Sequence, residues 1–269
     1  MTAAAVGVLL RSTPAATAQG RGNSKGKVSE MQGGSVAVIE LFTSEGCSSC
    51  PPADTNLRRI SEREPTSEGT VIPLSFHVDY WNYLGWKDPF SQEAFSERQR
   101  DYARASKQEG IYTPQMVVNG KYAFNGSDEA LSDEAIRLSL SRPATHVVNL
   151  SVSKSKTDDK YAVSYTVGHA GAGTDAGTDA DTAKADSDFQ INIAVATDTE
   201  SVKVVRGENG GRELSHVWVV KNFDVRQLTN DKGVIEIDPA IVSAGHTRVV
   251  AYVQSKASRE ITGAAAVEL

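Results

Sequence analysis

The sequence has few cysteines, little charge imbalance and no long hydrophobic run, and each shortage excludes a class of protein. Two cysteines in 269 residues exclude a small scaffold held together by several disulfides. The net charge is only −6 and the Lys and Arg residues are scattered, which argues against nucleic acid as a partner. No apolar run reaches the roughly 20 residues that a helix needs to cross a bilayer, so we expect no transmembrane segment.

The composition is sufficient for folded cores without external staples. Hydrophobic residues make up 39% of the chain, and its length is slightly below that of two typical domains. We therefore expect two domains, over residues 35–143 and 144–269.

The first residues resemble a clipped export signal. Residues 3–10 are apolar, and Ala16-Thr17-Ala18 has the small-x-small pattern of a cleavage site. We expect a truncated signal peptide over 1–18, a flexible leader over 19–34 and a periplasmic or secreted protein. The alternative is a disordered alanine-rich tail, because Arg11 follows the short apolar run directly and no basic residue precedes it.

Residues 35–143 alternate between strand and helix patterns. Residues 36–42 are almost continuously apolar, as in a strand covered on both faces, whereas Asn119-Gly120 is a strong hairpin signal. Asp88 and Pro89 offer an N-cap and a first helical position. The expected strands are 36–42, 71–78, 116–118 and 122–124, and the expected helices follow Cys50, Asp88 and Ser127. This order, βαβ then ββα, is that of thioredoxin-like proteins.

Residues 144–269 carry β patterns instead. About eight short segments alternate or cluster β-branched residues, which predicts an all-β, sandwich-like domain. Residues 168–188 are dominated by Gly, Ala, Thr and Asp, and we expect them to be a disordered insertion within a hairpin.

The only two cysteines form the motif Cys47-Ser-Ser-Cys50 at the end of the first expected strand. At a helix start, the first sulfur is favoured as a thiolate and the second can attack a mixed disulfide. We therefore expect Cys47 to be the nucleophile and Cys50 the resolving thiol, exposed at the sheet edge. The alternatives are a zinc half-site, inert thiols, or a Cu(I) site that adds His77.

Two further groups are candidates for catalysis. Pro114 follows Thr113 just before the third strand, where a thioredoxin-like protein has a cis-proline beside the motif and backbone groups free to pair with a substrate. Glu40 is the one charged residue of its strand, and we hypothesise that it lies beneath the disulfide with a raised pKa and relays the proton when Cys50 attacks. The alternative is that Glu40 pairs with a basic side chain.

The segment 79–86 is rich in aromatic residues and emerges at the same sheet edge as the cysteines. Tyr80, Trp81 and Trp86, together with Thr113, could form a wall that binds an extended peptide. The alternative is that these aromatic side chains pack on each other as core.

Several strings in this order resemble one family of secreted thioredoxin-like proteins that is catalogued only as a domain of unknown function. They are residues 40–54, 77–81, 84–86, 112–115 and 207–212. The resemblance covers about residues 35–269 and implies a thioredoxin-like domain with an appended β-rich region and a redox role, with no established substrate.

The sequence thus favours a thiol-disulfide oxidoreductase that uses Cys47 and Cys50 as its redox-active disulfide and needs no other cofactor. Its expected partners are a protein or small molecule bearing a thiol or disulfide, and a second redox protein that resets the pair. A copper carrier using both cysteines and His77, and a non-catalytic secreted binding protein, are the alternatives.

Overall fold

The structure of this protein is a computed structural model, and it describes residues 28–29, 34–63, 69–154, 160–171, 187–243 and 246–269. The predicted export signal, most of the predicted leader and most of the insertion predicted over 168–188 lie outside these ranges. None of the helices in the described ranges combines the length and apolar character needed to span a bilayer.

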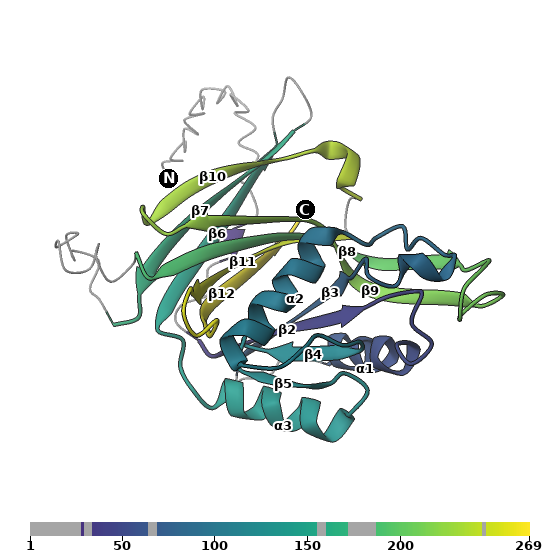
Figure 1. Cartoon of the computed structure of the whole chain (residues 1–269). Helices are drawn as coiled ribbons and strands as arrows, with labels where there is room; N and C mark the ends of the chain where they lie inside the picture. Colours follow the sequence, from purple (N-terminus) through teal and green to yellow (C-terminus); the bar gives the residue numbers. More distant parts are fainter. Residues whose placement is uncertain (1–27, 30–33, 64–68, 155–159, 172–186, 244–245) are drawn as a thin grey trace, which may run out of the picture.

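In the first half of the chain three helices alternate with strands, and in the second half strands follow almost exclusively (Figure 1). The helices are α1 (Pro51–Ser61), α2 (Glu93–Ser106) and α3 (Glu129–Leu140), with short 3-10 turns at Asn82–Leu84 and Pro239–Ile241. The strands are β1 (Val28–Ser29), β2 (Val36–Thr43), β3 (Thr70–His77), β4 (Gln115–Val118), β5 (Tyr122–Asn125), β6 (His146–Lys154), β7 (Tyr161–His169), β8 (Phe189–Lys203), β9 (Glu213–Gln227), β10 (Lys232–Ile237), β11 (Thr247–Ser255) and β12 (Ile261–Glu268).

The first half of the chain has the predicted βαβ and ββα order. Strands β2 and β3 are parallel neighbours, β4 is antiparallel to β2, and β5 completes this edge of the sheet. The β4–β5 turn has positive φ at both Asn119 and Gly120, as a tight hairpin turn requires, so the hairpin prediction is confirmed. A side chain at Gly120 would collide with the backbone oxygen of Arg259.

Helices cover both faces of this part of the sheet. Strand β2 alternates, so Ile39 and Leu41 pack with α1 and α3, whereas Val38 and Phe42 pack on the α2 side. Figure 1 shows α2 in front of the sheet, with α1 and α3 on its other side. The expectation of a strand covered on both faces is confirmed, because every residue of β2 is buried.

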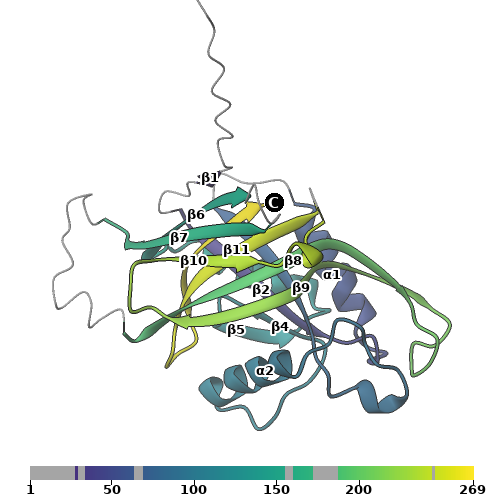
Figure 2. The same ribbon diagram turned by 90° about the horizontal axis from the view of Figure 1, so that it is seen from above.

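A smaller sheet makes the second half a sandwich. Strands β1, β6, β7 and β10 form it, in that order, and it packs against one face of β8, β11 and β12 (Figure 2). The core between the two sheets is aliphatic and includes Leu150, Val163, Ile193 and Val249. The predicted class, a thioredoxin-like α/β part followed by a β-sandwich part, is therefore correct.

The two parts share a sheet across the boundary expected at residue 143. The larger sheet has eight strands in the order β12-β11-β8-β9-β3-β2-β4-β5, so β9 lies beside β3. Strands β3 and β9 are parallel and pair at Ser75 and Val219. Because this pairing is short, Pro73, which has no backbone N–H to donate, is tolerated on the inner strand β3.

Two local expectations were wrong. Strand β7 pairs with β6 and β10, and β8 pairs with β9 and β11, so residues 168–188 connect two sheets and do not lie within a hairpin. Helix α2 begins at Glu93 and not at Pro89. Asp88 does not cap the helix, because its carboxylate accepts the backbone N–H groups of Glu45 and Phe90.

Candidate functional site

Cys47 and Cys50 form a disulfide at the start of α1. Their Cα atoms are 5.5 Å apart, and Cys50 is the N-cap residue of the helix. Pro51 and Pro52 occupy the first turn of the helix. Backbone N–H groups in this turn have no intrahelical acceptor, so their absence in proline costs no hydrogen bond. The motif therefore lies at the positive end of the helix, where a thiolate is favoured.

Both sulfurs are buried, contrary to the exposure expected from sequence. Cys47 is 1% exposed and Cys50 is 0% exposed, whereas Ser48 and Ser49 between them are exposed. The Ser49 hydroxyl lies 3.4 Å from Cys47 Sγ. The exposure was mispredicted because a segment far along the chain covers the motif.

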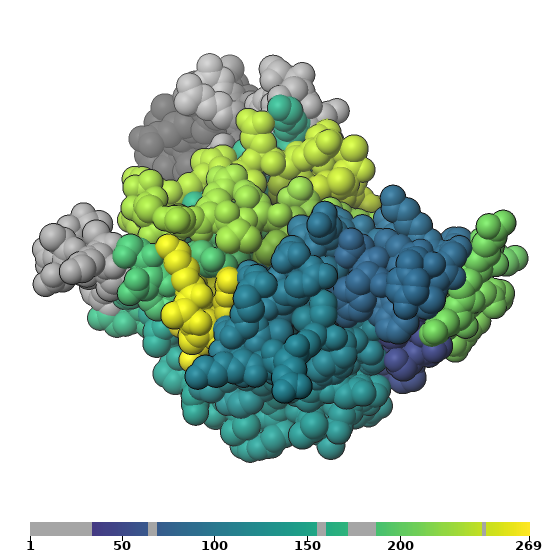
Figure 3. All heavy atoms as spheres, viewed as in Figure 1, coloured from purple at the N-terminus to yellow at the C-terminus, as the bar shows by residue number. Residues whose placement is uncertain are grey.

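That segment is the loop of residues 204–212 between β8 and β9, which we call the β8–β9 loop. The Asn209 side chain is fully buried, and its Nδ2 donates to the carbonyl oxygens of Glu45 at 2.9 Å and Cys47 at 3.0 Å. Glu208 Oε2 accepts the Ser48 N–H at 3.0 Å. In Figure 3 the green hairpin tip meets the purple and blue segments of the motif and the aromatic region at one end of the molecule.

The cis-proline prediction is confirmed, because the Thr113–Pro114 bond is cis. Pro114 is buried, and both it and Ala53 of α1 approach the space left by Gly126. The Thr113 hydroxyl accepts a hydrogen bond of 2.7 Å from Trp81 Nε1. The Cβ and the carbonyl oxygen of Trp81 lie close to Gly46, so this residue connects the cis-proline turn to the start of the motif.

The other two aromatic candidates lie in the same region but make different contacts. Trp86 Nε1 donates to Glu45 Oε2 at 2.6 Å, and the Trp86 side chain lies against Gly207 of the β8–β9 loop. Tyr80 turns toward α2, where its hydroxyl donates to Gln99 Oε1. Burial raises the pKa of Tyr80 to about 12, so this phenol stays protonated at neutral pH. All three rings are half-buried, which fits a wall and a packed loop equally well.

Glu40 lies on the other face of the sheet from α1. Its carboxylate pairs with Arg98 of α2 at 2.7 Å and accepts hydrogen bonds from the hydroxyls of Tyr102 and Tyr252. The structure therefore favours the alternative of a basic partner over the position beneath the disulfide. Strand alternation is the reason, because the neighbouring Leu41 faces α1.

His77 is engaged with a carboxylate. Its Nδ1 lies 2.7 Å from Asp88 Oδ2, and both side chains are fully buried. The imidazole partner holds the pKa of Asp88 below its usual range, although burial alone acts to raise it. In the part of the chain that the structure describes, no three His, Cys, Asp or Glu side chains have an arrangement that could hold a metal ion. The copper alternative therefore gains no support.

A buried histidine that the sequence reasoning passed over lies beside the motif. His216 of β9 is 1% exposed, with Nε2 3.5 Å from Glu45 Oε1 and Nδ1 3.6 Å from Asp54 Oδ1. The two carboxylates raise the pKa of His216 to about 10 against the opposing effect of burial. Glu45 and Asp54 flank the motif in the sequence. These two acidic residues were the signal from which a buried basic partner could have been predicted.

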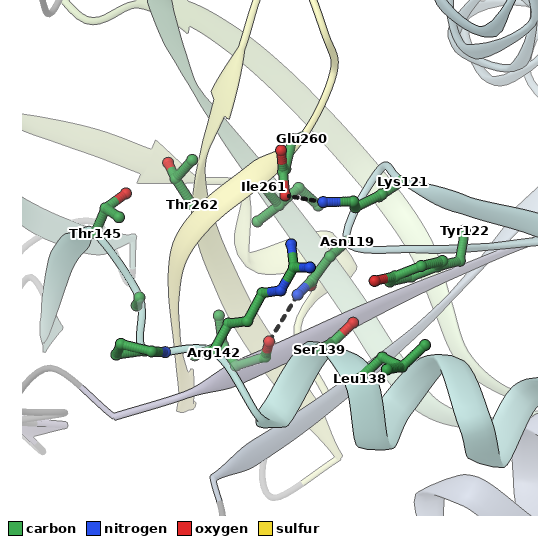
Figure 4. Close-up of a pocket in the computed structure, with 13 residues that line it drawn as sticks. Asn119, Lys121, Tyr122, Leu138, Ser139, Arg142, Thr145, Glu260, Ile261 and Thr262 are labelled. Carbon is green, nitrogen blue, oxygen red and sulfur yellow. Dashed lines mark hydrogen bonds and ion pairs between the residues drawn. The ribbon is translucent and has the colours of Figure 1, made fainter.

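The structure also has a cavity of about 290 Å³ at the far end of the sheet. It lies between the end of α3 and the start of β12, beside Val36 at the beginning of β2, whereas the motif follows the end of β2. Figure 4 shows Asn119 bonded to the backbone and Lys121 paired with Glu260 in its wall. No cysteine or histidine lines it, so it is separate from the Cys47–Cys50 motif.

These features define a thioredoxin-like protein with a CxxC disulfide and a cis-proline turn beside it. The chain belongs to the family described as "Protein of unknown function (DUF1223)", whose model matches residues 38–254. A comparison with curated proteins gave no match.

Two solved structures are similar over most of the chain. Protein AGR_C_4864 from Agrobacterium tumefaciens has 26% sequence identity and a TM-score of 0.59, covering 86% of this chain and 93% of its own. HBP35 of Porphyromonas gingivalis has 17% identity and a TM-score of 0.56, covering 88% of this chain and 76% of its own. The second likeness concerns the fold alone.

Proposed function

We propose that this protein is a thiol-disulfide oxidoreductase acting on a thiol- or disulfide-bearing substrate. The observation that carries the proposal is the Cys47–Cys50 disulfide at the N-terminus of α1, beside the cis Thr113–Pro114 turn. A disulfide between residues three apart at a helix start is closed and opened by thiol exchange with little rearrangement of the chain.

Cys47 is the sulfur that exchanges with the substrate in this proposal. A substrate thiolate attacks Cys47 Sγ, the Cys47–Cys50 bond breaks, and Cys50 leaves as a thiolate. A second substrate thiolate then attacks the substrate sulfur of the mixed disulfide, which releases an oxidised substrate and the reduced pair. The reverse sequence reduces a substrate disulfide, and a partner of opposite redox state resets the enzyme.

The proposal includes a wall for the substrate and a location outside the reducing cytoplasm. Trp81 and Thr113 are bonded to each other next to the motif, and Trp86 lies at its other side, so they flank any chain that approaches Cys47. The location is supported by the resemblance of residues 3–18 to an export signal.

Titration in redox buffers tests the activity. The full-length protein is equilibrated at a series of glutathione or dithiothreitol ratios, and free thiols are counted by alkylation and mass. Reversible opening and closing of one bridge supports the proposal. A bridge that never opens in the folded protein, or never re-forms, contradicts it.

Trapping in the host identifies the substrate. Cys50→Ser removes the resolving thiol, so mixed disulfides at Cys47 persist and clients accumulate linked to the protein. The matched control is Cys47→Ser, which should trap few or none. Equal recovery of partners by the Cys47→Ser, Cys50→Ser double variant would instead support a non-catalytic binding protein.

A further inference from the structure

The reaction proposed above needs a proton at a place that water does not reach. When the disulfide opens, Cys50 leaves as a thiolate inside the fold, and it has to be protonated before the reduced pair is stable. Cys50 is 0% exposed, and the β8–β9 loop covers the neighbouring backbone through Asn209. A protein group near the motif is therefore a better source of the proton than bulk solvent.

The described residues near the motif include one buried cluster of ionisable side chains. It consists of His216 of β9, Glu45 of the β2–α1 connection, Asp54 of α1, His77 of β3 and Asp88 of the connection before α2. The two imidazole rings are 4.5 Å apart between their centres. His77 is already paired with Asp88, so the remaining pairing is that of His216 with Glu45 and Asp54.

The geometry around His216 favours the cation. Each ring nitrogen faces a carboxylate oxygen, whereas a neutral ring would turn the lone pair of one nitrogen toward a negative charge. Neither nitrogen, nor the Glu45 and Asp54 oxygens that face them, has a normal hydrogen bond within the described structure. Buried groups left in this state are a frequent mark of a functional site.

The cluster is connected to the reacting sulfurs through the chain itself. Glu45 precedes Cys47 by two residues, and its backbone carbonyl shares the Asn209 side chain with that of Cys47. Asp54 follows Cys50 by one helical turn, and its N–H donates to the Cys50 carbonyl at 3.1 Å. His216 therefore bridges the carboxylates on both sides of the disulfide.

We propose that His216, held by Glu45 and Asp54, is the proton store of the thiol-disulfide reaction and acts on Cys50 through Asp54. When the disulfide opens, the imidazolium gives up its proton and the Cys50 thiolate becomes a thiol. When Cys50 attacks a mixed disulfide, the proton returns to His216 and the departing substrate sulfur leaves as a thiolate. His216 is thus a positioning residue for this proton, and the inference rests on the proposed function.

The pKa of His216 gives the proposal a pH signature. At about 10, it lies well above the ordinary value of 6.5, so the store is filled at neutral pH and empties as the pH approaches 10. The rate constant of disulfide opening, divided by the concentration of attacking thiolate, should therefore be constant from about pH 6 to 9 and fall at higher pH.

The test compares His216→Gln with the full-length wild type. Dithiothreitol opens the disulfide in buffers from pH 6 to 10, and the reaction is stopped with acid at set times. Free thiols are then counted by alkylation. We expect the rate constant to fall about 100-fold at neutral pH, as for a lost general acid, and the decline near pH 10 to disappear. His246→Gln is the matched control, because His246 is an exposed histidine outside the cluster, and it should behave as the wild type.

Asp54→Asn provides a second variant of nearly unchanged volume. It removes the carboxylate charge that faces His216 Nδ1 and keeps the backbone bond from Asp54 to Cys50, so it should also slow opening and change the pH profile. This variant decides the matter if His216→Gln does not fold. Wild-type rates and profile in a folded variant of either kind would overturn the inference. Failure of the wild type to open and close its bridge would overturn the proposed function instead, so the two failures are distinct.

Discussion

Glu40 and His216 are both ionisable and buried, and they are neutralised in different ways on different sides of the molecule. Glu40 has a permanent cation, Arg98, and two tyrosine hydroxyls around it. Burial raises the pKa of Tyr102 and Tyr252, so both remain hydrogen-bond donors to the carboxylate at every ordinary pH. The carboxylate of Glu40 is thus fully engaged by one cation and two hydroxyl donors on the α2 side of the sheet.

Replacing Glu40 tests this difference. Glu40→Gln leaves the Arg98 guanidinium as a buried, unpaired cation, and we expect a loss of about 3–5 kcal/mol in the free energy of unfolding. Urea unfolding of the oxidised protein at pH 7 measures it. Glu260→Gln, which breaks the exposed pair with Lys121, is the control and should cost less than about 1 kcal/mol.

The pH profile of disulfide opening separates the two roles. In Glu40→Gln it should keep the wild-type shape, because the carboxylate faces α2 and not the motif. A profile altered in the manner expected for His216→Gln would return the relay role to Glu40.

Residues whose roles follow from the local order of strands and helices could be predicted from sequence. Residues whose roles depend on a partner far along the chain could not. Glu40 was expected to be buried because it lies in an apolar strand. Its partner Arg98 is 58 residues away, and no pattern in either segment predicts that the two side chains pair. Cys47, Cys50 and Pro114 were predicted because each has a fixed place in one local order of strands and helices. His216 was not, because its significance depends on which strand lies beside β3.

At the scale of elements, the β8–β9 loop is the part of the site that has no counterpart in local sequence rules. Its string, residues 207–212, resembled a family motif without a stated role. In the structure the loop is closed by its own backbone hydrogen bonds between Val204 and the segment Gly211–Arg212, and Arg212 donates to Asn209 Oδ1 at 2.8 Å. The loop thus presents a pre-positioned amide to the motif.

Helix α2 illustrates the opposite error, in which a local rule was applied correctly and a distant partner prevailed. Asp88 followed by Pro89 is a good helix start. Asp88 instead accepts the Glu45 N–H and faces His77, so it serves the site and the helix begins at Glu93. Functional sites are where such local rules are expected to fail.

Asn209→Ala tests whether the β8–β9 loop limits access to Cys47. The change removes two hydrogen bonds to the backbone around the motif, and we expect the reduced protein to be alkylated by iodoacetamide at Cys47 about tenfold faster. The rate is followed by mass spectrometry. Val205→Ala is the control, because Val205 belongs to the same loop and is 63% exposed. Equal rates in all three proteins would show that the loop does not restrict Cys47.

At the scale of the whole molecule, the thioredoxin-like part and the β-rich part are one structure. The β-rich part supplies β9 to the edge of β3, the β8–β9 loop to the disulfide and His216 to the buried cluster. It also contributes to the core of the thioredoxin-like part. Phe223 of β9 makes an edge-to-face contact with Phe76 of β3, and the Tyr252 hydroxyl of β11 accepts a hydrogen bond from Arg98 of α2. The change in sequence pattern at residue 144 marks a change in secondary structure and not a gap between cores.

This shared core predicts that the thioredoxin-like part does not fold alone. A fragment of residues 35–143 would expose the α2-side core, including Phe76 and Phe95, where β8, β9 and β11 now cover it. Each Å² of apolar surface that stays in water forfeits roughly 25 cal/mol, so an uncovered area of several hundred Å² offsets the roughly 5–15 kcal/mol by which a domain is stable. We expect the full-length protein to unfold in one urea transition that is the same by far-UV circular dichroism and by hydrogen exchange, and the fragment to show none. A fragment with its own cooperative transition and a reversible Cys47–Cys50 bridge would mean that the β-rich part is an accessory to an independent redox domain.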